Sequence, residues 1–430
     1  MIDLAPIHVV LGSGGAGVST VAASAAVALD GGRSAVEKGR TLIVTLDRFR
    51  QGARTFGVYS TPGQPIPVSQ HVDLLEIDTL AQVADLWSTL RGVVAVAGGS
   101  VFGEVGTIDP AELTGLPGVE QFLAWRRIRD EAVSGRWTRV VVDCSGASDP
   151  LSFLAVPTMV AGYIERIWPR QRRLTGVTEN PRLTGGAAVV DAVVSDCTDL
   201  AELLVDPSVV RAHLVHRPDL YGVETCERQL AVLSLLGVAV GSVVANPIGS
   251  ESAVFDPAVF DPDGLEPAGF APGTPDGHPT GPSGVSGREF PVEIRKRLDP
   301  TGQIDWATTR LLPQPPRTVA ALRKVGARLD TAPRRAAGSS AARVEQLGGT
   351  GLTTTFRLSW PQPLPDPRTL SMGRSGDDLV VSLCGYRHRV TLPSVLRRCT
   401  VHDARWEDGM LSVRFQPDPR VWPRNGSAVD

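Results

Sequence analysis

A glycine-rich stretch near the start of the chain, Gly12-Ser13-Gly14-Gly15-Ala16-Gly17-Val18-Ser19-Thr20, constrains the fold most strongly. The apolar run at 7–11 before it predicts a buried strand, and the alanine-rich run at 18–29 after it predicts a helix. A strand, a glycine turn and a helix start together aim backbone N–H groups and the helix dipole at an anion. The sequence therefore predicts a phosphate-binding loop in an α/β fold.

The chemistry of such a loop needs glycines, a hydroxyl group for Mg²⁺ and a lysine that contacts the phosphates. Ser19 supplies the hydroxyl, and Val18 stands where the lysine belongs. The glycines are Gly12, Gly14, Gly15 and Gly17. The whole chain has only three lysines, Lys38, Lys296 and Lys324, and none of them is in the loop. We therefore expect that nucleotide binding can persist here without fast turnover.

Length and composition limit the class of protein. The chain has 430 residues with 42% apolar residues, which favours two or three domains. The net charge of −3 gives no electrostatic reason to expect a nucleic-acid partner. The five cysteines are scattered and form no CxxC pair, so we expect no zinc site. The first residues lack a basic stretch ahead of an apolar core, so we expect no secretory signal. No apolar run reaches about 18 residues, so we expect a cytoplasmic protein without a transmembrane segment.

The first 250 residues alternate short β-branched runs with helical stretches, which predicts a doubly wound, mostly parallel sheet. The expected strands are 7–11, 42–46, 74–77, 140–142, 212–215 and 242–245, and the expected helices are 18–29, 80–90, 119–132 and 224–236. A Pro/Gly-rich stretch at 251–290 is expected to be a disordered insert. A last helix at 318–329 completes an α/β domain assigned to residues 1–335.

The end of the chain has a different pattern. Residues 336–352 are rich in small residues and are interpreted as a linker. Short strands separated by turns follow within 353–420 and predict a small all-β sandwich. Trp360, Trp406 and Phe415 are expected in its core.

The order of motifs in the first domain resembles that of the ArsA-type arsenite-pump ATPases and the related tail-anchored-protein targeting ATPases. The loop at 12–20 resembles their deviant phosphate loop, GKGGxGKTT. The segment 42–47 resembles the strand that ends in their first switch, and Val140–Gly146 resembles their second switch, VVVDTAPTG. Val243–Pro247 resembles their VVNRV strand.

The resemblance implies roles for individual residues. Asp47 would position the attacking water, while Ser19 and Asp143 would hold the magnesium ion of Mg-ATP. Asn246 would face the adenine. The phosphates would lie against the four loop glycines, Ser19 and Thr20. Family members work as dimers with nucleotide at the interface.

Residues 389–411 resemble the small heat-shock (α-crystallin) sandwich, which some ArsA-like proteins carry at this end and which implies a protein client. The chain departs from the family at both lysines, which are replaced by Ser13 and Val18. The resemblance with these losses implies a pseudo-ATPase. We expect it to act as a homodimer, or as a regulatory subunit in a heterodimer with a lysine-bearing homologue. Arg48 or Arg50 is a candidate substitute cation.

Two other interpretations remain open at this stage. One is a non-catalytic chaperone-like or scaffolding protein built on a loop that binds nothing. The other is a dinucleotide-binding oxidoreductase, because the loop also matches GxGxxG. The first acidic residue after the next strand is Asp47, thirty residues beyond Gly17, whereas the dinucleotide motif needs about twenty. No long Met- or Leu-rich helical hairpin for an apolar client is evident.

Overall fold

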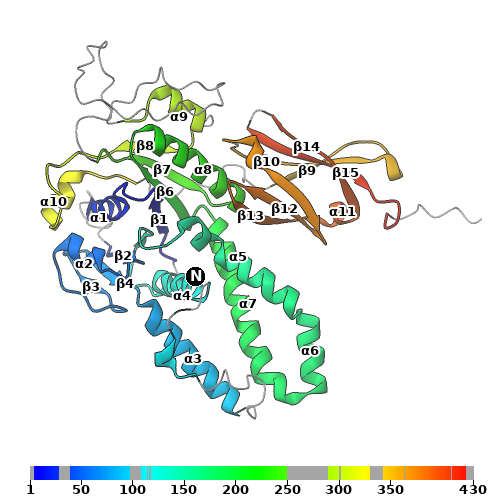
Figure 1. The fold of residues 1–430 in the computed structure, drawn as a ribbon, viewed down its shortest axis with the longest axis horizontal. Coiled ribbons are helices and arrows are strands. Elements are labelled where there is room, and N and C mark those ends of the chain that lie inside the picture. Colours follow the sequence, from blue (N-terminus) through cyan, green and yellow to red (C-terminus); the bar gives the residue numbers. More distant parts are fainter. Residues whose placement is uncertain are drawn as a thin grey trace, which may run out of the picture.

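The structure is a computed structural model. It describes residues 4–28, 39–96, 108–113, 115, 118–248, 289–299, 302–329, 342–363, 365–407 and 409–422. These residues form an α/β domain and a β-sandwich that packs beside it (Figure 1). The insert expected at 251–290 lies outside the described residues, apart from Glu289 and Phe290.

The α/β domain is built on an eight-stranded sheet in the order β3-β4-β2-β5-β1-β6-β7-β8. Its strands are β1 (Ile7–Gly12), β2 (Thr41–Thr45), β3 (Ile66–Pro67), β4 (Val72–Glu76), β5 (Arg139–Asp143), β6 (Val210–His216), β7 (Val240–Ala245) and β8 (Asp305–Thr308). All neighbours pair in parallel except β3, which is antiparallel to β4. The predicted parallel sheet is confirmed, and β8 is an additional edge strand.

Helices cover both faces of the sheet, because successive residues of a strand point to opposite faces. In β1, Ile7, Val9 and Leu11 belong to one core cluster and Val10 to the other. The Val10 face is covered by α1 (Val18–Ala28), α2 (Gln51–Phe56) and α10 (Val319–Val325). The opposite face is covered by α3 (Thr79–Val96), α4 (Val119–Val133), α5 (Pro150–Ile167), α7 (Thr184–Val205), α8 (Leu220–Leu236) and α9 (Val292–Leu298). The helix expected at 318–329 is shorter than predicted.

Helices α5 and α7, joined by α6 (Arg170–Glu179), form a long helical arm that projects from the sheet together with α3 (Figure 1). Helices α5, α6 and α7 were not among those expected from sequence, and whether the arm could hold an apolar client stays a prediction. Arg173 ties the arm together: its buried guanidinium donates to Asp191 (2.8 Å) and Glu165 (2.6 Å). Within the described part of the chain, no helix is both long and apolar enough to span a membrane.

The sandwich consists of two antiparallel sheets, β14-β15-β10-β9 and β11-β12-β13. Its strands are β9 (Arg343–Gly348), β10 (Thr355–Pro361), β11 (Ser371–Ser375), β12 (Asp378–Leu383), β13 (Tyr386–Thr391), β14 (Cys399–Glu407) and β15 (Met410–Pro417), and the short α11 spans Ser394–Arg397. Every second residue of β10 and β15 is buried, as an aligned sandwich requires. Trp360 and Phe415 lie in the core as predicted, but Trp406 is 39% exposed.

The boundary between linker and sandwich also differs from the prediction. Residues 343–348, assigned to the linker, form β9 and pair with β10. The strand was missed because all its residues are exposed, so it lacks the alternating apolar pattern of a half-buried strand.

Helix α8 joins the two domains. Its Leu230 and Leu233 belong to the core of the α/β domain, whereas Ala231 and Leu235 belong to the core of the sandwich. Gln362, fully buried, donates from Nε2 to the Ala231 carbonyl oxygen (2.8 Å). The sandwich therefore packs directly on helix α8 of the α/β domain.

Candidate functional site

The loop between β1 and α1 has the backbone shape that binds phosphate. Gly15 and Gly17 have φ angles of +76° and +81°, which L side chains rarely adopt. A Cβ atom on Gly12 would lie 2.0 Å from the Val215 carbonyl oxygen, so the loop enters tightly against β6. Gly14 and Gly15 face open space. The turn therefore leaves its outer face free for a ligand.

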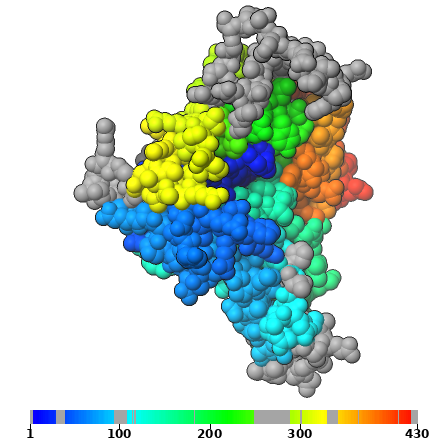
Figure 2. All heavy atoms as spheres, turned by 60° about the vertical axis from the view of Figure 1, so that its left-hand side comes forward, coloured from blue at the N-terminus to red at the C-terminus, as the bar shows by residue number. Residues whose placement is uncertain are grey.

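The other predicted residues gather at the same edge of the sheet. Parallel strands place their carboxyl ends together, and ligands bind in α/β proteins where the strand order reverses. Strand β1 lies at that point, between β5 and β6. Asp47 follows β2, Asp143 ends β5 and Asn246 follows β7. In Figure 2 the first segment of the chain (dark blue) reaches the surface between the blue, green and yellow segments.

A cluster of hydroxyl and carboxylate groups lies at the start of α1. The Ser19 and Ser145 hydroxyl groups are 2.7 Å apart, and the Ser145 N–H donates to Asp143 Oδ1 (3.0 Å). Asp143 is 2% exposed, and this burial raises the pKa of its carboxyl group, opposed by hydrogen bonds from Ser145 and Ser19. Nearby Asp47 raises this pKa further. Oxygen donors of this kind are those that Mg²⁺ prefers, so the residues fit a magnesium site.

Asp47 is held by the chain that follows it. Its carboxylate accepts hydrogen bonds from the N–H groups of Phe49 (2.8 Å) and Gln51 (3.2 Å), at the start of α2. A Cβ atom on Gly146 would lie 2.3 Å from the Asp47 Cα atom. The loops that follow β2 and β5 are thus in direct contact, and only glycine fits between them.

Asn246 is engaged with the phosphate-type loop in this conformation. Its Nδ2 donates to the Ala16 carbonyl oxygen (2.7 Å), and its Oδ1 accepts from the Thr309 hydroxyl (2.5 Å). A Cβ atom on Gly17 would lie 2.4 Å from Nδ2. The side chain therefore braces the loop from below. Thr20, the residue after Ser19 in α1, is partly exposed.

The positions without lysine are occupied differently. Val18 is buried in the apolar cluster that includes Val10 and Val215, and Ser13 is also buried. Arg48 forms an ion pair with Glu120 of α4. Arg50 is exposed, with a left-handed backbone (φ 58°) just before α2. Arg48 would have to leave Glu120 to act as the substitute cation.

Two residues of the site had not been assigned a role from sequence. Ser145 stands two residues after Asp143, in the second-switch segment, so its place beside Ser19 follows from the spacing of that motif. Thr309 follows β8, and no sequence signal marked β8 as part of the sheet. Among the described residues, no three His, Cys, Asp or Glu side chains group together as a metal site.

The fold and the loop define an α/β protein of the phosphate-loop class. Residues 7–256 match the family described as anion-transporting ATPase, and residues 353–415 match the HSP20-like domain found in ArsA. The chain therefore belongs to the ArsA family of anion-transporting ATPases. The match also disfavours the dinucleotide-binding alternative.

Some relatives match almost the whole chain, and others match little more than half of it. Protein Rv2184c of Mycobacterium tuberculosis is 32% identical and covers 97% of this chain and 98% of its own length. Protein SCO2128 of Streptomyces coelicolor is 30% identical, over 96% of this chain and 98% of its own length. The putative arsenical pump-driving ATPase 1 of Aquifex aeolicus is 21% identical, over 56% of this chain and 63% of its own.

Proposed function

We propose that this chain binds Mg-ATP or Mg-ADP at residues 12–20, hydrolyses ATP slowly or not at all, and regulates a lysine-bearing homologue. One observation carries the proposal: the loop keeps its glycine geometry and its Ser19–Asp143 cluster, while Val18 is packed into the core. Backbone N–H groups can still bind phosphate. Loss of the cation beside the phosphates is expected to cost about 10³-fold or more in rate.

The residues would divide the work as follows. Ser19 and Asp143 would hold Mg²⁺, which when bound neutralises phosphate charge. The N–H groups of the loop and α1 would bind the phosphate oxygens. Asp47 would release the N–H groups of Phe49 and Gln51 before it could orient a water molecule. Asn246 would brace the loop and lie toward the adenine.

A partner chain is supported by apolar side chains around the site. Large exposed hydrophobic residues follow the carboxyl ends of strands β2, β6, β7 and β8: Phe49 (79% exposed), Tyr221, Ile248 and Leu311. Apolar and aromatic side chains that ring a site are typical of surfaces that another protein covers. We propose that a second ArsA-type chain covers this rim, either as a homodimer or as a lysine-bearing heterodimer partner.

Titration calorimetry with Mg-ATP and Mg-ADP on the full chain tests nucleotide binding. We expect micromolar affinity for the wild type and none for Gly17→Ala, because the new Cβ atom would meet Asn246 Nδ2. Gly63→Ala is a matched control: Gly63 has the same φ of +81°, with nothing within 4 Å of its Cβ position. A folded wild-type chain that gives no heat would contradict the proposal.

A second candidate function is a chaperone-like protein that holds an apolar client. It is favoured by exposed side chains along the arm, Met159, Tyr163, Ile167 and Leu174. The first three are spaced by four residues, so they lie on one face of α5. Two results together would select this function. Calorimetry would detect no nucleotide binding, and the wild type would suppress client aggregation whereas Tyr163→Ser and Ile167→Ser would not.

We also propose a cytoplasmic location. All five cysteines are free thiols, and Cys144, Cys197, Cys226 and Cys399 are buried. Unpaired cysteines are typical of a reducing compartment. Fractionation of cells that express the tagged chain would test this.

A further inference from the structure

The sandwich touches the start of α5 through one side chain. The Tyr386 hydroxyl, on the first residue of β13, donates to Asp149 Oδ1 at 2.7 Å. Burial and this hydrogen bond raise the pKa of the Tyr386 phenol, so the hydroxyl remains a donor. Asp149 is the N-cap of α5, and the same Oδ1 accepts from the N–H groups of Leu151 (3.1 Å) and Ser152 (3.2 Å). The carboxylate that caps α5 therefore accepts a hydrogen bond from the sandwich as well as from the helix.

The turn that presents Tyr386 is tight and strained. Leu383 pairs with Tyr386, so Cys384 and Gly385 alone connect β12 to β13. Their φ angles are +51° and +84°, as a two-residue hairpin turn requires, but a cysteine seldom adopts such an angle. Cys384 and Tyr386 pack against the core of the α/β domain. Strain of this kind persists only where surrounding contacts hold it, and it often marks a functional position.

A second contact lies at the opposite end of α5. Arg166, in its last turn, donates from Nη2 to the Ser375 hydroxyl at the end of β11 (3.1 Å). The β11–β13 sheet thus contacts α5 in both its first and its last turn, about 25 Å apart. The sandwich also packs on α8, so it contacts the α/β domain at α8 and at both ends of α5.

The start of α5 is linked to the magnesium ligand expected at Asp143. Only residues 144–148 separate Asp143 from Asp149. Within that loop, Ser145 contacts Ser19, and Gly146 packs on the backbone of Asp47. The loop that contacts Ser19 and Asp47 therefore ends at the residue that Tyr386 contacts.

We propose that Tyr386 is a positioning residue for the second-switch loop: the sandwich holds Asp149, and thereby sets the stability of residues 144–149. The nucleotide part of this inference rests on the proposed function, whereas the contact itself does not. If nucleotide binding changes the Tyr386 contact, then by linkage loss of that contact changes nucleotide affinity by the same factor.

Hydrogen exchange on the full chain without nucleotide tests the contact. Tyr386→Phe removes only the hydroxyl, and we expect the amides of Leu151 to Phe153 to exchange about fivefold to tenfold faster. The matched control is Tyr163→Phe, an exposed tyrosine on the same helix, which should leave exchange unchanged. Unchanged exchange in Tyr386→Phe would overturn the proposal.

The second experiment adds saturating Mg-ADP. We expect altered exchange in β13 of the wild type, absent in Tyr386→Phe, together with a shift of a few fold in the calorimetric affinity of that variant. Heat of binding without any change in β13 would overturn the coupling. If Mg-ADP gives no heat, the proposed function fails, and the comparison without nucleotide alone decides whether Tyr386 holds the loop.

Discussion

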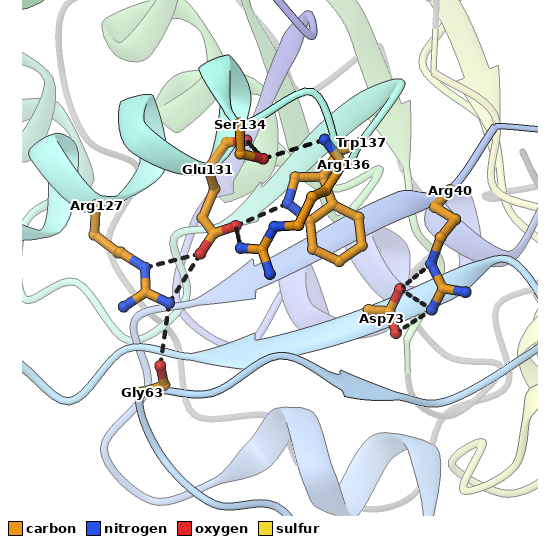
Figure 3. A network of polar contacts seen from close by, with 8 residues as sticks. All are labelled: Arg40, Gly63, Asp73, Arg127, Glu131, Ser134, Arg136 and Trp137. Atoms are coloured by element: carbon orange, nitrogen blue, oxygen red, sulfur yellow. Dashed lines mark hydrogen bonds and ion pairs between the residues drawn. The ribbon is translucent and has the colours of Figure 1, made fainter.

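Buried carboxylates at the two ends of the central sheet have different hydrogen-bond donors. Near the amino ends, Glu131 of α4 accepts hydrogen bonds from Arg127, Arg136 and Trp137, and Asp73 of β4 accepts three from Arg40 (Figure 3). At the carboxyl end, Asp143 and Asp47 are also buried, but among the described residues they accept hydrogen bonds from backbone N–H and hydroxyl groups.

This difference suggests that the carboxylates near the amino ends stabilise the fold and that those at the carboxyl end serve function. A buried carboxylate that is matched by arginines is already neutralised and holds elements together. A buried carboxylate without a cation is costly, and burial raises the pKa of Asp143 accordingly. We infer that the carboxyl end is built for a positive charge that arrives with a ligand or a partner.

The largest expected effect comes from giving the carboxyl end its own cations. The double variant Ser13→Lys, Val18→Lys should gain about 10²- to 10³-fold in ATP turnover, because ammonium groups would then stabilise the transferring phosphate. Steady-state phosphate release measures it, with Ser13→Gln, Val18→Met as the uncharged control. Tight Mg-ATP binding without any gain in rate would show that other parts of the catalytic machinery are also lost.

Removing a matched carboxylate should destabilise the fold. Glu131→Gln replaces one acceptor oxygen with an amide donor facing arginine or tryptophan N–H groups, and should cost about 3 kcal/mol of unfolding free energy. Urea denaturation measures the change. Glu345→Gln, which removes an exposed pairing with Arg357, should change it by less than about 0.5 kcal/mol. Equal effects at both sites would break the comparison.

His216, at the carboxyl end of the sheet, should make the stability of the fold depend on pH. It ends β6, is fully buried, and burial lowers its pKa to about 4. The unfolded chain therefore takes up this proton first as pH falls below about 6.5, and stability is lost from there down to about 4. We expect about 2 kcal/mol less unfolding free energy at pH 5 than at pH 7.5 from this group.

The measurement is urea denaturation across that range for the wild type and His216→Asn, which should lose this part of the pH dependence. His402→Asn, at an exposed histidine of β14, is the control and should behave as the wild type does. A wild-type profile that His216→Asn leaves unchanged would refute the assignment.

The smallest effect should come from neutralising Asp143. Its folded-state pKa is raised, so the ionised carboxylate costs stability at neutral pH, and this cost disappears as pH falls below that pKa. Asp143→Asn should stabilise the fold slightly at pH 7.5 without Mg²⁺, and by less at acid pH. Asp73→Asn, which leaves Arg40 without its carboxylate, should have the opposite sign. Thermal unfolding of both variants would decide.

Much of the α/β domain could be predicted from sequence because its strands are buried on both faces and read as continuous Val, Ile and Leu runs. Strand β8, with the sequence Asp305-Trp306-Ala307-Thr308, has no such run, since it lies at the sheet edge. The turn of the arm was missed because α6 is polar at most positions and is joined to α5 and α7 by tertiary ion pairs of Arg173 with Glu165 and Asp191.

The site was predictable to the extent that it depends on chain order. Ser19, Asp47 and Asp143 each follow a recognisable strand or loop, and strand topology brings them to one edge. The bracing of the loop by Asn246 and Thr309, the pairing of Arg48 with Glu120, and the bond from Tyr386 to Asp149 all join residues far apart in sequence. Such contacts depend on how domains and loops pack, which local pattern does not encode.

Helix α8 has apolar side chains on two sides, one for each domain. A chain shortened before β9 would leave Leu235 and Ala231 facing water, with the Ala231 carbonyl oxygen deprived of Gln362. Such a fragment should be aggregation-prone and poorly soluble, whatever the sandwich contributes to activity. Deletion phenotypes of the C-terminal region would then report damaged folding, and single substitutions on its surface are the sounder way to learn its purpose.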